Sequence, residues 1–377
     1  MVKRVLQICY LNPYENYGGV ERYVLDLSEA LTSQYGVTVD ILCAGKNSKI
    51  SKTGTGNIKS VRVLFFGKKE LFFISKYIYG RRVRKYLNHH QGDYDAIHFH
   101  GDNGLIGRRF AEKTVLTLHG IARGTDSTRK RVSSYLPMQI EKNNVREAGI
   151  IFSISSPAKE FFEGYIRNKE IRLIKQSINT SKYHIRSEEE KKEARIKLKI
   201  EDNAIVGTIT GRDPERKGLD LAIRTINAVE EPGAALYAIG FPKIVSETDK
   251  VKFIGNVSED TKRLYLTASD FFIFPSKKEG FPISVLEAAA TGLPLIVSRQ
   301  SGVSELKDLV PFFREIDSYS LVDYGSTLRE LIDAIQRPDF NRVKSDISLI
   351  NQYSVFNAAA EYMRAYEKLK VNNIAGN

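Results

Sequence analysis

The chain has 377 residues, which suits two domains of ordinary size and is too many for a single core. Hydrophobic residues make up 42% and charged residues 27%, a balance typical of a soluble globular protein, and no apolar run is long enough to span a membrane. The formal net charge of +12 favours acidic partners such as nucleotide phosphates, anionic lipids or nucleic acid, without choosing among them.

The N-terminal segment "MVKRVLQICYLNPYE" begins with basic residues, but its apolar part is short and no small-residue cleavage site follows. We therefore predict a first β-strand there and no signal peptide. The two cysteines, Cys9 and Cys43, fall on predicted buried strands, and free buried thiols are favoured over a disulfide in so cysteine-poor a chain. Together these features predict a cytoplasmic protein.

Short β-branched runs alternate with helical patterns through the first half of the chain. Between the first two runs, Val20, Tyr23, Val24 and Leu27 recur at helical spacing, and Gly36 ends this helix. The alternation predicts a parallel sheet covered by helices on both faces. The predicted strands of this half are RVLQIC, VTVDILC, VRVLFF, YDAIHF, TVLTL, IIFSI and IRLIK.

The pattern restarts after a polar and then highly charged segment, of which 186–199 is predicted to be a solvated helix. A domain boundary is therefore expected near 177–184. In open parallel sheets, ligands bind beyond the carboxyl ends of the strands, so residues at strand ends are the candidates for a site. The predicted strands of the second half are AIVGTITG, AALYAIG, VKFIG, DFFIFP and PLIVS.

Two predicted strand ends have features of an anion site. After the first strand, Gly18 and Gly19 stand where a loop meets a helix N-terminus, so their N–H groups are able to approach an anion closely. The alternative is a loop that needs glycine for a positive φ angle. The first strand of the second half ends in "GRDPERKG", where Arg212 and Lys217 suit a diphosphate, unless both belong to a solvated turn.

Three histidines lie at the ends of predicted strands in the first half. His98 and His100 share one face of the strand in "DAIHFHG". A metal site with Asp102 is conceivable, but a third ligand is not evident and a polar role lining a cleft is favoured. His119 ends the next strand, where its imidazole is able to donate a hydrogen bond to a substrate hydroxyl or carbonyl; a locally satisfied histidine is the alternative.

The stretch "FPSKKEGFPISVLEAAATGLPLIVS", residues 274–298, contains two glutamates eight positions apart. Glu279 falls in a loop after a strand, and Glu287 falls inside a helix in which Pro282 suits the first turn and Gly292 the C-terminal end. One carboxylate is able to accept sugar hydroxyls and the other a ribose diol, with phosphates at the helix N-terminus between them. A glycosidase acid and nucleophile is the alternative, which a glutamate within a helix fits poorly.

These motifs together resemble the retaining glycosyltransferases of family 4, which have the GT-B fold. The resemblance covers nearly the whole chain and rests on GGVERYV, DAIHFHG, TLHG, GRDPERKG and EGFPISVLEAAATGLPLIVS, the last of which contains an E-x7-E signature. It implies two Rossmann-like parallel-sheet domains facing across a cleft. Residues 1–178 would bind the acceptor, 179–355 would bind the nucleotide sugar, and a final helix at about 356–377 would return to the first domain.

The resemblance also implies roles for individual residues. Glu279 would bind hydroxyls of the transferred sugar, Glu287 would hold the ribose, and His119 would contact the sugar near the reacting carbon. Arg212 and Lys217 would neutralise the diphosphate leaving group. Further donor contacts would come from Gly18, Gly19, Gly255, Val257, Gly280, Phe281, Pro282 and Ile283, and the acceptor cleft would include His100, Arg123 and Arg129.

The implied reaction moves a sugar from a UDP or GDP sugar to an acceptor hydroxyl with retention of anomeric configuration, in synthesis of a cell-surface polysaccharide, glycolipid or glycoconjugate. It requires no metal ion and no cofactor apart from the nucleotide-sugar co-substrate. The family often has an aspartate after the cleft histidine, where this chain has Gly120, and this limits inference about the donor sugar.

The stretch 68–90 has two interpretations. It is either a basic amphipathic helix at an anionic membrane face, or a surface helix that packs Phe72, Ile78 and Val83 on its own domain. The basic segment 123–134 adds positive charge near the predicted acceptor cleft, which suits a phosphorylated or lipid-linked acceptor, or an anionic glycan. The cations of the first stretch are Lys76, Arg81, Arg82, Arg84 and Lys85.

A different class of function is a non-enzymatic protein that binds phosphate or nucleic acid on a Rossmann-like scaffold. The charge permits it, but no nucleic-acid-binding module is visible, and phosphate ligands explain the charge as well. A dinucleotide-dependent dehydrogenase is weaker still, because no G-x-G-x-x-G follows the first strand. The sequence therefore favours a glycosyltransferase with no nucleic-acid partner.

Overall fold

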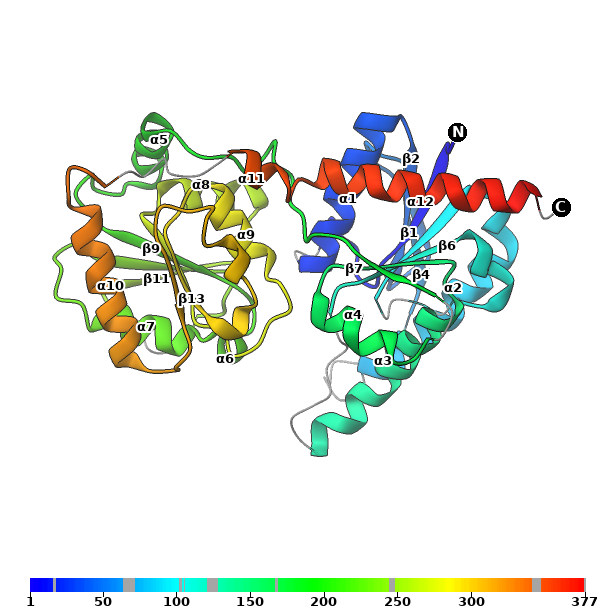
Figure 1. The fold of residues 1–377 in the computed structure, drawn as a ribbon, viewed down its shortest axis with the longest axis horizontal. Helices are drawn as coiled ribbons and strands as arrows, with labels where there is room; N and C mark the ends of the chain where they lie inside the picture. The colour runs from blue at the N-terminus through cyan, green and yellow to red at the C-terminus, as the bar shows by residue number, and fades with distance from the viewer. Residues whose placement is uncertain are drawn as a thin grey trace. The chain divides into compact units, whose positions relative to one another are not determined.

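The chain forms two compact α/β units in a computed structural model (Figure 1). The N-terminal unit comprises Met1–Ser177 and Ser354–Asn377, and the C-terminal unit comprises Ile178–Tyr353. The predicted division after residue 178 lies one residue from this boundary. The structure describes residues 1–15, 18–63, 72–101, 104, 106–120, 128–166, 169–243, 248–340 and 347–375.

The N-terminal unit contains an eight-stranded sheet of order β3-β4-β2-β1-β5-β6-β7-β8, parallel except for the edge strand β3. The central strands β1, β5 and β6 are buried along nearly their whole length, as expected when helices cover both faces. The strands are β1 Arg4–Ile8, β2 Thr38–Gly45, β3 Lys49–Lys52, β4 Asn57–Arg62, β5 Ala96–His100, β6 Thr114–Leu118, β7 Ile150–Ser153 and β8 Ile171–Leu173.

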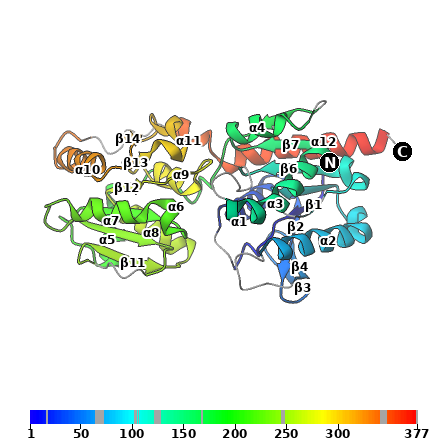
Figure 2. The ribbon, with the colours of Figure 1, turned by 90° about the horizontal axis from the view of Figure 1, so that it is seen from below.

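The α-helices in the described part of this unit pack around the sheet. The first, α1, ends where Gly36 takes the left-handed conformation (φ 64°) and donates its N–H to Thr32, so the predicted C-cap is confirmed. Figure 2 shows β3 and β4 at one edge of the unit with α2 beside them. The helices are α1 Gly19–Tyr35, α2 Phe72–His90, α3 Thr128–Glu147, α4 Ser156–Glu163 and α12 Val355–Ala375.

The last helix, α12, belongs to the N-terminal unit although it follows the whole C-terminal unit in sequence. It lies against α1 (Figure 1), and Val355, Ala359, Tyr362 and Leu369 on its inner face are at most 3% exposed. Burial of one such apolar face contributes roughly 1.5–3 kcal/mol per large side chain. The two tyrosines of this face, Tyr362 and Tyr366, also bring hydroxyl groups to the buried side of the sheet.

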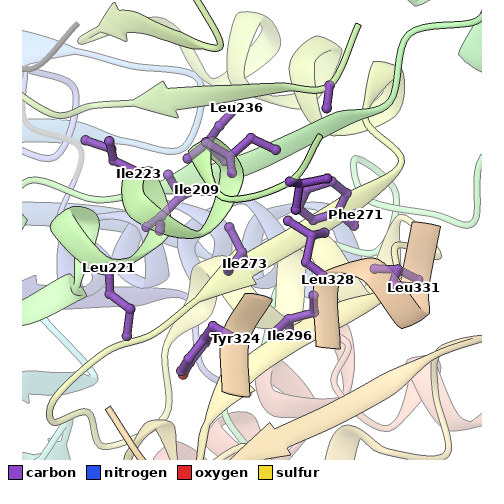
Figure 3. Packing of buried hydrophobic residues seen from close by; sticks show 14 of the residues in the cluster. Ile209, Leu221, Ile223, Leu236, Phe271, Ile273, Ile296, Tyr324, Leu328 and Leu331 are labelled. Atoms are coloured by element: carbon purple, nitrogen blue, oxygen red, sulfur yellow. The ribbon is translucent and has the colours of Figure 1, made fainter. Parts of the chain in front are cut away.

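The C-terminal unit contains a fully parallel six-stranded sheet of order β11-β10-β9-β12-β13-β14. On one face of the sheet, Ile209, Phe271 and Ile296 pack with Leu221 of α7 and Leu328 of α10 (Figure 3). The strands are β9 Val206–Thr210, β10 Ala235–Ile239, β11 Val251–Gly255, β12 Phe271–Phe274, β13 Leu295–Ser298 and β14 Phe313–Ile316.

The charged helix of this unit is more buried than its sequence predicts. The helix α5 begins after a capping box in which Ser187 and Glu190 bond each other's backbone N–H. However, Lys191 and Arg195 are buried and pair with Asp270, so the prediction of a solvated helix is wrong for this face. The helices are α5 Glu188–Leu198, α6 Pro214–Lys217, α7 Leu219–Asn227, α8 Glu259–Ala268, α9 Ile283–Ala290, α10 Leu321–Ile335 and α11 Ile347–Asn351.

Candidate active site

The predicted cation and carboxylate motifs meet at one point of the C-terminal sheet. Strand β9 pairs with β10 on one side and with β12 on the other, so the chain order of the strands diverges between β9 and β12. The loops that leave the carboxyl ends of these two strands, residues 211–218 and 275–282, lie side by side there. Such a switch point is where open parallel sheets bind ligands.

Gly218 allows these two loops to approach each other closely. It has a φ of 72°, and a Cβ at this position would lie 2.0 Å from the carbonyl oxygen of Pro275. Only glycine fits both the backbone angle and the contact. The short helix α6, capped by Asp213 with Pro214 in its first turn, then directs Arg216 and Lys217 toward the second loop.

Glu279 is the centre of this contact. Its Oε1 accepts from Lys217 Nζ at 2.8 Å, from Ser276 Oγ at 3.2 Å and from Arg216 Nη1. The side chains of Glu279 and Lys217 are 11% and 12% exposed. Burial lowers the pKa of Lys217, while the charge of Glu279 opposes that shift. The structure therefore places a mostly buried, charged pair at the switch point.

The two arginines of this loop differ. Arg216, which was not among the predicted site residues, contacts Glu279, whereas the predicted Arg212 is exposed. Within the described part of the chain, Arg212 makes no hydrogen bond and no ion pair. The turn of α6 explains the difference, because it puts Arg216 and Lys217 next to β12 and leaves Arg212 before the helix, where its guanidinium is open to a ligand.

Glu287 forms a second charged centre on the same loop–helix segment. Its carboxylate is 3% exposed, and both oxygens accept from Lys262 Nζ, at 2.8 and 2.7 Å. Lys262 also lies 3.1 Å from Glu259, which in turn accepts from the Tyr183 hydroxyl. Burial acts to lower the pKa of Lys262, but Glu287 and Glu259 outweigh it and raise that pKa. Lys262 was not predicted to belong to the site.

The helix between the two centres begins one residue later than predicted. Pro282 is the N-cap of α9 with extended backbone angles, so it precedes the first helical turn. Gly280 is exposed, Phe281 stacks on Tyr353 with ring centroids 6.1 Å apart, and Ile283 is the first helical residue. Elsewhere in the unit, Gly255 ends β11 with a φ of 67° and Val257 is partly buried.

The glycine pair of the N-terminal unit serves the start of α1. Gly18 is the N-cap with a φ of −79°, Gly19 is the first helical residue, and neither has the positive φ of the alternative interpretation. A Cβ on Gly18 would lie 1.9 Å from Oε2 of Glu21, so the glycine leaves room for that carboxylate at the first turn. Carboxylates are stabilised there by the helix dipole.

The carboxyl ends of β5 and β6 carry the histidines. His100 Nδ1 lies 3.0 Å from His119 Nε2, and His100 Nε2 lies 3.0 Å from Oε1 of Gln7 on β1. His98 stacks on His100 with ring centroids 4.3 Å apart. Gln7 Nε2 donates to Ser28 Oγ at 3.0 Å, so this first chain of contacts runs from β6 to α1.

A second chain of hydrogen bonds starts from His98. Its Nε2 lies 2.8 Å from Thr117 Oγ1, and its Nδ1 lies 2.7 Å from the Tyr366 hydroxyl. Thr117 Oγ1 lies 2.9 Å from the Tyr362 hydroxyl, which lies 2.9 Å from the Tyr23 hydroxyl. We call both chains together the histidine network. The hydroxyls from α12 thus provide hydrogen-bond partners for buried polar groups, which would otherwise destabilise the folded chain.

All three imidazoles of the histidine network are neutral. Burial lowers the pKa of His98 and of His100 well below their usual value, and it lowers the pKa of His119 to about 3. His98 and His100 are fully buried, whereas His119 is part-exposed at the end of β6. His119 is therefore the most accessible imidazole of the network.

The described part of the chain contains no group of three or more His, Cys, Asp or Glu residues arranged to hold a metal ion. Asp102, Arg123 and their loops lie outside the described residues, and only the backbone of Arg129 is described, in α3. An Asp-x-Asp triplet occurs at 93–95. It precedes β5, and Asp95 accepts the N–H groups of Lys3 and Arg4 there, at the opposite end of the strands from the histidines.

The helix α2 packs on its own unit, as one of the two interpretations of its sequence predicts. Tyr79, Val83 and Leu87 are buried against the sheet and Ile78 is partly buried beside them, so the packing prediction is confirmed for the residues described. The side chain of Phe72 and residues 68–71 lie outside the described part. Four cations point to solvent: Arg81, Arg82, Arg84 and Lys85. Cys9 and Cys43 are free and buried, as predicted.

Two protein-family models match successive parts of the chain. The model for Glycosyltransferase Family 4 matches residues 17–182, and the model for Glycosyl transferases group 1 matches residues 204–337. The chain is a group 1 glycosyltransferase of family 4. This glycosyltransferase has the GT-B fold of two parallel-sheet α/β domains. Among the helices of its described part, none combines the length and the apolar composition of a membrane span.

Curated relatives of the glycosyltransferase include bacterial sugar transferases. One is the putative teichuronic acid biosynthesis glycosyltransferase TuaC of Bacillus subtilis, 26% identical over 219 residues, which cover 56% of this chain and 55% of TuaC. Another is the UDP-Gal:alpha-D-GlcNAc-diphosphoundecaprenol alpha-1,3-galactosyltransferase of Escherichia coli, 26% identical over 69% of this chain and 73% of its own length. The alignment therefore spans about half of the first relative.

Solved structures resemble the glycosyltransferase over nearly its full length. Sucrose-phosphate synthase from Thermosynechococcus elongatus has a TM-score of 0.74 with 18% identity, covering 98% of this chain and 100% of that chain. Anabaena Alr3699/HepE in complex with UDP and glucose has a TM-score of 0.67 with 14% identity, covering 98% and 100%. At these identities the likeness establishes the fold.

Proposed function

We propose that the glycosyltransferase moves a sugar from a nucleoside diphosphate sugar to an acceptor hydroxyl with retention of configuration. The observation that carries this proposal is the Lys217–Glu279 pair at the switch point between β9 and β12. Lys217 and Glu279 are in direct contact. The cation suits the phosphates of a nucleotide sugar, and the carboxylate suits the hydroxyls of its sugar. Exposed Arg212 supplies a second, fork-shaped phosphate donor.

In the proposed reaction, the bond between the anomeric carbon and the diphosphate oxygen breaks, and the electron pair stays with the phosphate. The acceptor oxygen attacks the same face of the sugar, and its proton passes to the departing phosphate. Lys217 and Arg212 stabilise the charge that develops on the leaving group, and electrostatic stabilisation of this kind usually contributes more to catalysis than any other single effect. Glu279 fixes the sugar through its hydroxyls, and no metal ion or cofactor is required.

Glu287 holds the ribose diol in this proposal. Its two oxygens already accept from Lys262, so the carboxylate is fixed in place and charged before the donor binds. A preorganised acceptor loses less conformational freedom on binding than a mobile one. Gly255 and Val257 then border the base, and the amide groups of Gly280 and Ile283 face the phosphates between the two carboxylates.

We further propose that the carrier is UDP or GDP and that the acceptor belongs to a cell-surface polysaccharide or glycolipid on the cytoplasmic side of a membrane. Support comes from the Escherichia coli relative, whose name describes a UDP-galactose donor and a diphosphoundecaprenol acceptor, and from HepE, whose structure contains UDP. Support from the chain itself is the set of four exposed cations on α2, which suits anionic lipid.

A thermal-shift panel tests the proposed function. UDP or GDP at a hundred times its dissociation constant should stabilise the chain by about 2.7 kcal/mol and raise its melting temperature. NAD and random-sequence DNA are the controls, and neither should raise it. Stabilisation by DNA alone would favour the nucleic-acid-binding alternative, and a shift with NAD alone would favour a dehydrogenase. A panel of nucleotide sugars assayed for hydrolysis then identifies the donor.

A further inference from the structure

The hydrogen bonds of the first chain of the histidine network all donate in one direction, because the chain ends on a carbonyl group, which only accepts hydrogen bonds. Ser28 Oγ donates to the backbone carbonyl of Val24 at 2.7 Å. A hydroxyl has one proton, so Ser28 Oγ must accept from Gln7 Nε2, which lies 3.0 Å away. This places the amide nitrogen of Gln7 toward α1 and its Oε1 toward His100.

The polarity continues through His100. Because Gln7 Oε1 only accepts, His100 Nε2 must carry a proton and donate across the 3.0 Å contact. His100 is neutral, since it is fully buried and its pKa is well below the usual value. Its Nδ1 therefore carries a lone pair, which accepts a hydrogen bond from the N–H of His119 Nε2 at 3.0 Å.

We propose that Ser28, Gln7 and His100 act as positioning residues that hold His119 in the tautomer protonated on Nε2, so that its Nδ1 is a hydrogen-bond acceptor for a hydroxyl of the donor sugar. Nδ1 has no hydrogen-bond donor within the part of the chain that the structure describes. The Tyr23 ring forms a T-shaped pair with the imidazole, with centroids 5.0 Å apart at 79°, and restricts its rotation.

This inference rests on the proposed function for its ligand, but the tautomer itself does not depend on any ligand. It changes the expectation from sequence that His119 donates a hydrogen bond. A neutral imidazole has one donor and one acceptor nitrogen, and the network uses the donor internally. The glycosyltransferase should therefore select a donor sugar that presents a free hydroxyl to His119, and should discriminate against one whose only group there is an acceptor.

The tautomer is measured directly by two-bond 15N–1H correlation spectra of the full chain labelled in its histidine side chains. His119 is assigned by loss of its signals in His119→Asn, and the three exposed histidines, His89, His90 and His184, serve as references. We expect the pattern of an Nε2–H tautomer for His119 and for His100. A pattern of Nδ1–H at His119 would overturn the proposal, whether or not the chain turns over a nucleotide sugar.

A variant of Gln7 sharpens this measurement. Gln7→Glu puts a carboxylate against His100 Nε2, which favours the imidazolium form of His100, so that Nδ1–H of His100 donates to His119. The proton of His119 should then move to Nδ1. Retention of the wild-type tautomer in a folded Gln7→Glu variant would contradict the relay. Should that variant fail to fold, the wild-type spectrum decides the question alone.

Substrate analogues test the acceptor role once a donor is identified. Deoxy and deoxyfluoro forms of each hydroxyl of that donor are compared, because fluorine accepts hydrogen bonds weakly and never donates. At one position, both analogues should lower kcat/KM by about tenfold, the value of one hydrogen bond. His119→Asn, whose amide oxygen falls near the position of Nδ1, should keep more activity than His119→Gln. A fluoro analogue that keeps the activity lost by the deoxy analogue at every such position would contradict the acceptor role.

Discussion

The two units carry different kinds of polar group at the carboxyl ends of strands in their sheets. In the C-terminal unit, the carboxyl ends of β9 and β12 carry full charges, with Lys217 and Arg216 on Glu279 and Lys262 on Glu287. In the N-terminal unit, the carboxyl ends of β5 and β6 carry neutral imidazoles tied to hydroxyls and an amide. Two largely parallel sheets thus carry charged groups in one unit and uncharged groups in the other.

This difference agrees with the proposed reaction, in which the enzyme binds both phosphates and sugar hydroxyls. Phosphates need cations as partners. Lys217 and Glu279, both mostly buried, stabilise each other's charge until a diphosphate replaces Glu279 as the partner of Lys217. Neutral groups whose donor and acceptor directions are fixed are able to distinguish the orientation of a sugar hydroxyl. Acid, loss of a site cation and loss of a surface cation should each affect the two units differently.

Acid should destabilise the N-terminal unit first. An unfolded imidazole takes up a proton near pH 6.5, whereas His98, His100 and His119 stay neutral when folded. Because the unfolded chain then binds more protons, unfolding free energy falls as pH falls below 6.5, by about 1.4 kcal/mol per pH unit for each imidazole and about 4 kcal/mol for three. Calorimetry between pH 7.5 and 5 measures this slope.

The C-terminal unit is the internal reference for that experiment. Burial alone would raise the pKa of Asp270, but Lys191 and Arg195 outweigh it and lower that pKa. The stability that Asp270 contributes is thus present above about pH 3.9 and lost only at lower pH. Hydrogen exchange of α1 and of α9 assigns each transition to its unit. Equal pH slopes in the two units would contradict the neutral histidine network.

Loss of Lys217 should have the largest effect on turnover. Lys217→Ala removes a preorganised cation beside the leaving diphosphate, so kcat/KM should fall about a hundredfold, or roughly 3 kcal/mol. Glu279 keeps Arg216 and Ser276 as partners, so the melting temperature should change little. The matched control is Arg224→Ala, an exposed cation on α7 that pairs with Asp220. Turnover that stays within threefold of wild type would remove Lys217 from the mechanism.

The two arginines of the loop should separate phosphate binding from sugar binding. Arg212→Ala should weaken binding of UDP or GDP about tenfold, the effect of one charge-assisted hydrogen bond, with no change in stability because Arg212 is exposed. Arg216→Ala should leave diphosphate affinity within about twofold and raise KM for the complete donor, because Arg216 holds Glu279. Titration calorimetry and steady-state kinetics measure the two effects, and the opposite assignment would show that Arg216 is the phosphate ligand.

The smallest effect concerns the exposed cations of α2. Replacing Arg82 and then Arg84 by alanine should reduce binding to anionic vesicles by about fivefold per cation, or roughly 1 kcal/mol each. Both side chains are exposed, so the fold should be unaffected. Arg314→Ala, an exposed cation of the C-terminal unit, is the control. Wild-type protein that shows no salt-sensitive co-sedimentation would end the proposal of membrane contact.

The sequence predicted the central parts of the fold better than its edges. Strand β12 is a continuous apolar run, because both faces of a parallel sheet are covered, and such a run is visible in sequence. The edge strands β3 and β14 escaped prediction, since KISK and FREI alternate charges with few apolar residues. Tertiary pairing with a neighbouring strand, and not local composition, makes these segments β.

Prediction of the candidate site depended on whether its partners lie on recognisable motifs. Lys217 and Glu279 each stand in a motif at a strand end, and the structure brings them into contact. Arg216 stands one residue before Lys217, and Lys262 stands in a separate helix. No spacing rule selects either residue. The contact between Thr117 and Tyr362 joins residues 245 positions apart. Only the packing of α12 on the N-terminal sheet creates it.

The central claim is that the C-terminal unit holds a diphosphate between Lys217 and Arg212. Isothermal titration of the full chain with UDP and with GDP tests it most directly, using wild type, Lys217→Ala and the control Arg224→Ala. The account predicts one binding site for at least one of these nucleotides in wild type and in Arg224→Ala, and an affinity lowered about a hundredfold in Lys217→Ala. Equal affinity in all three proteins, or no binding of either nucleotide to the wild type, would contradict it.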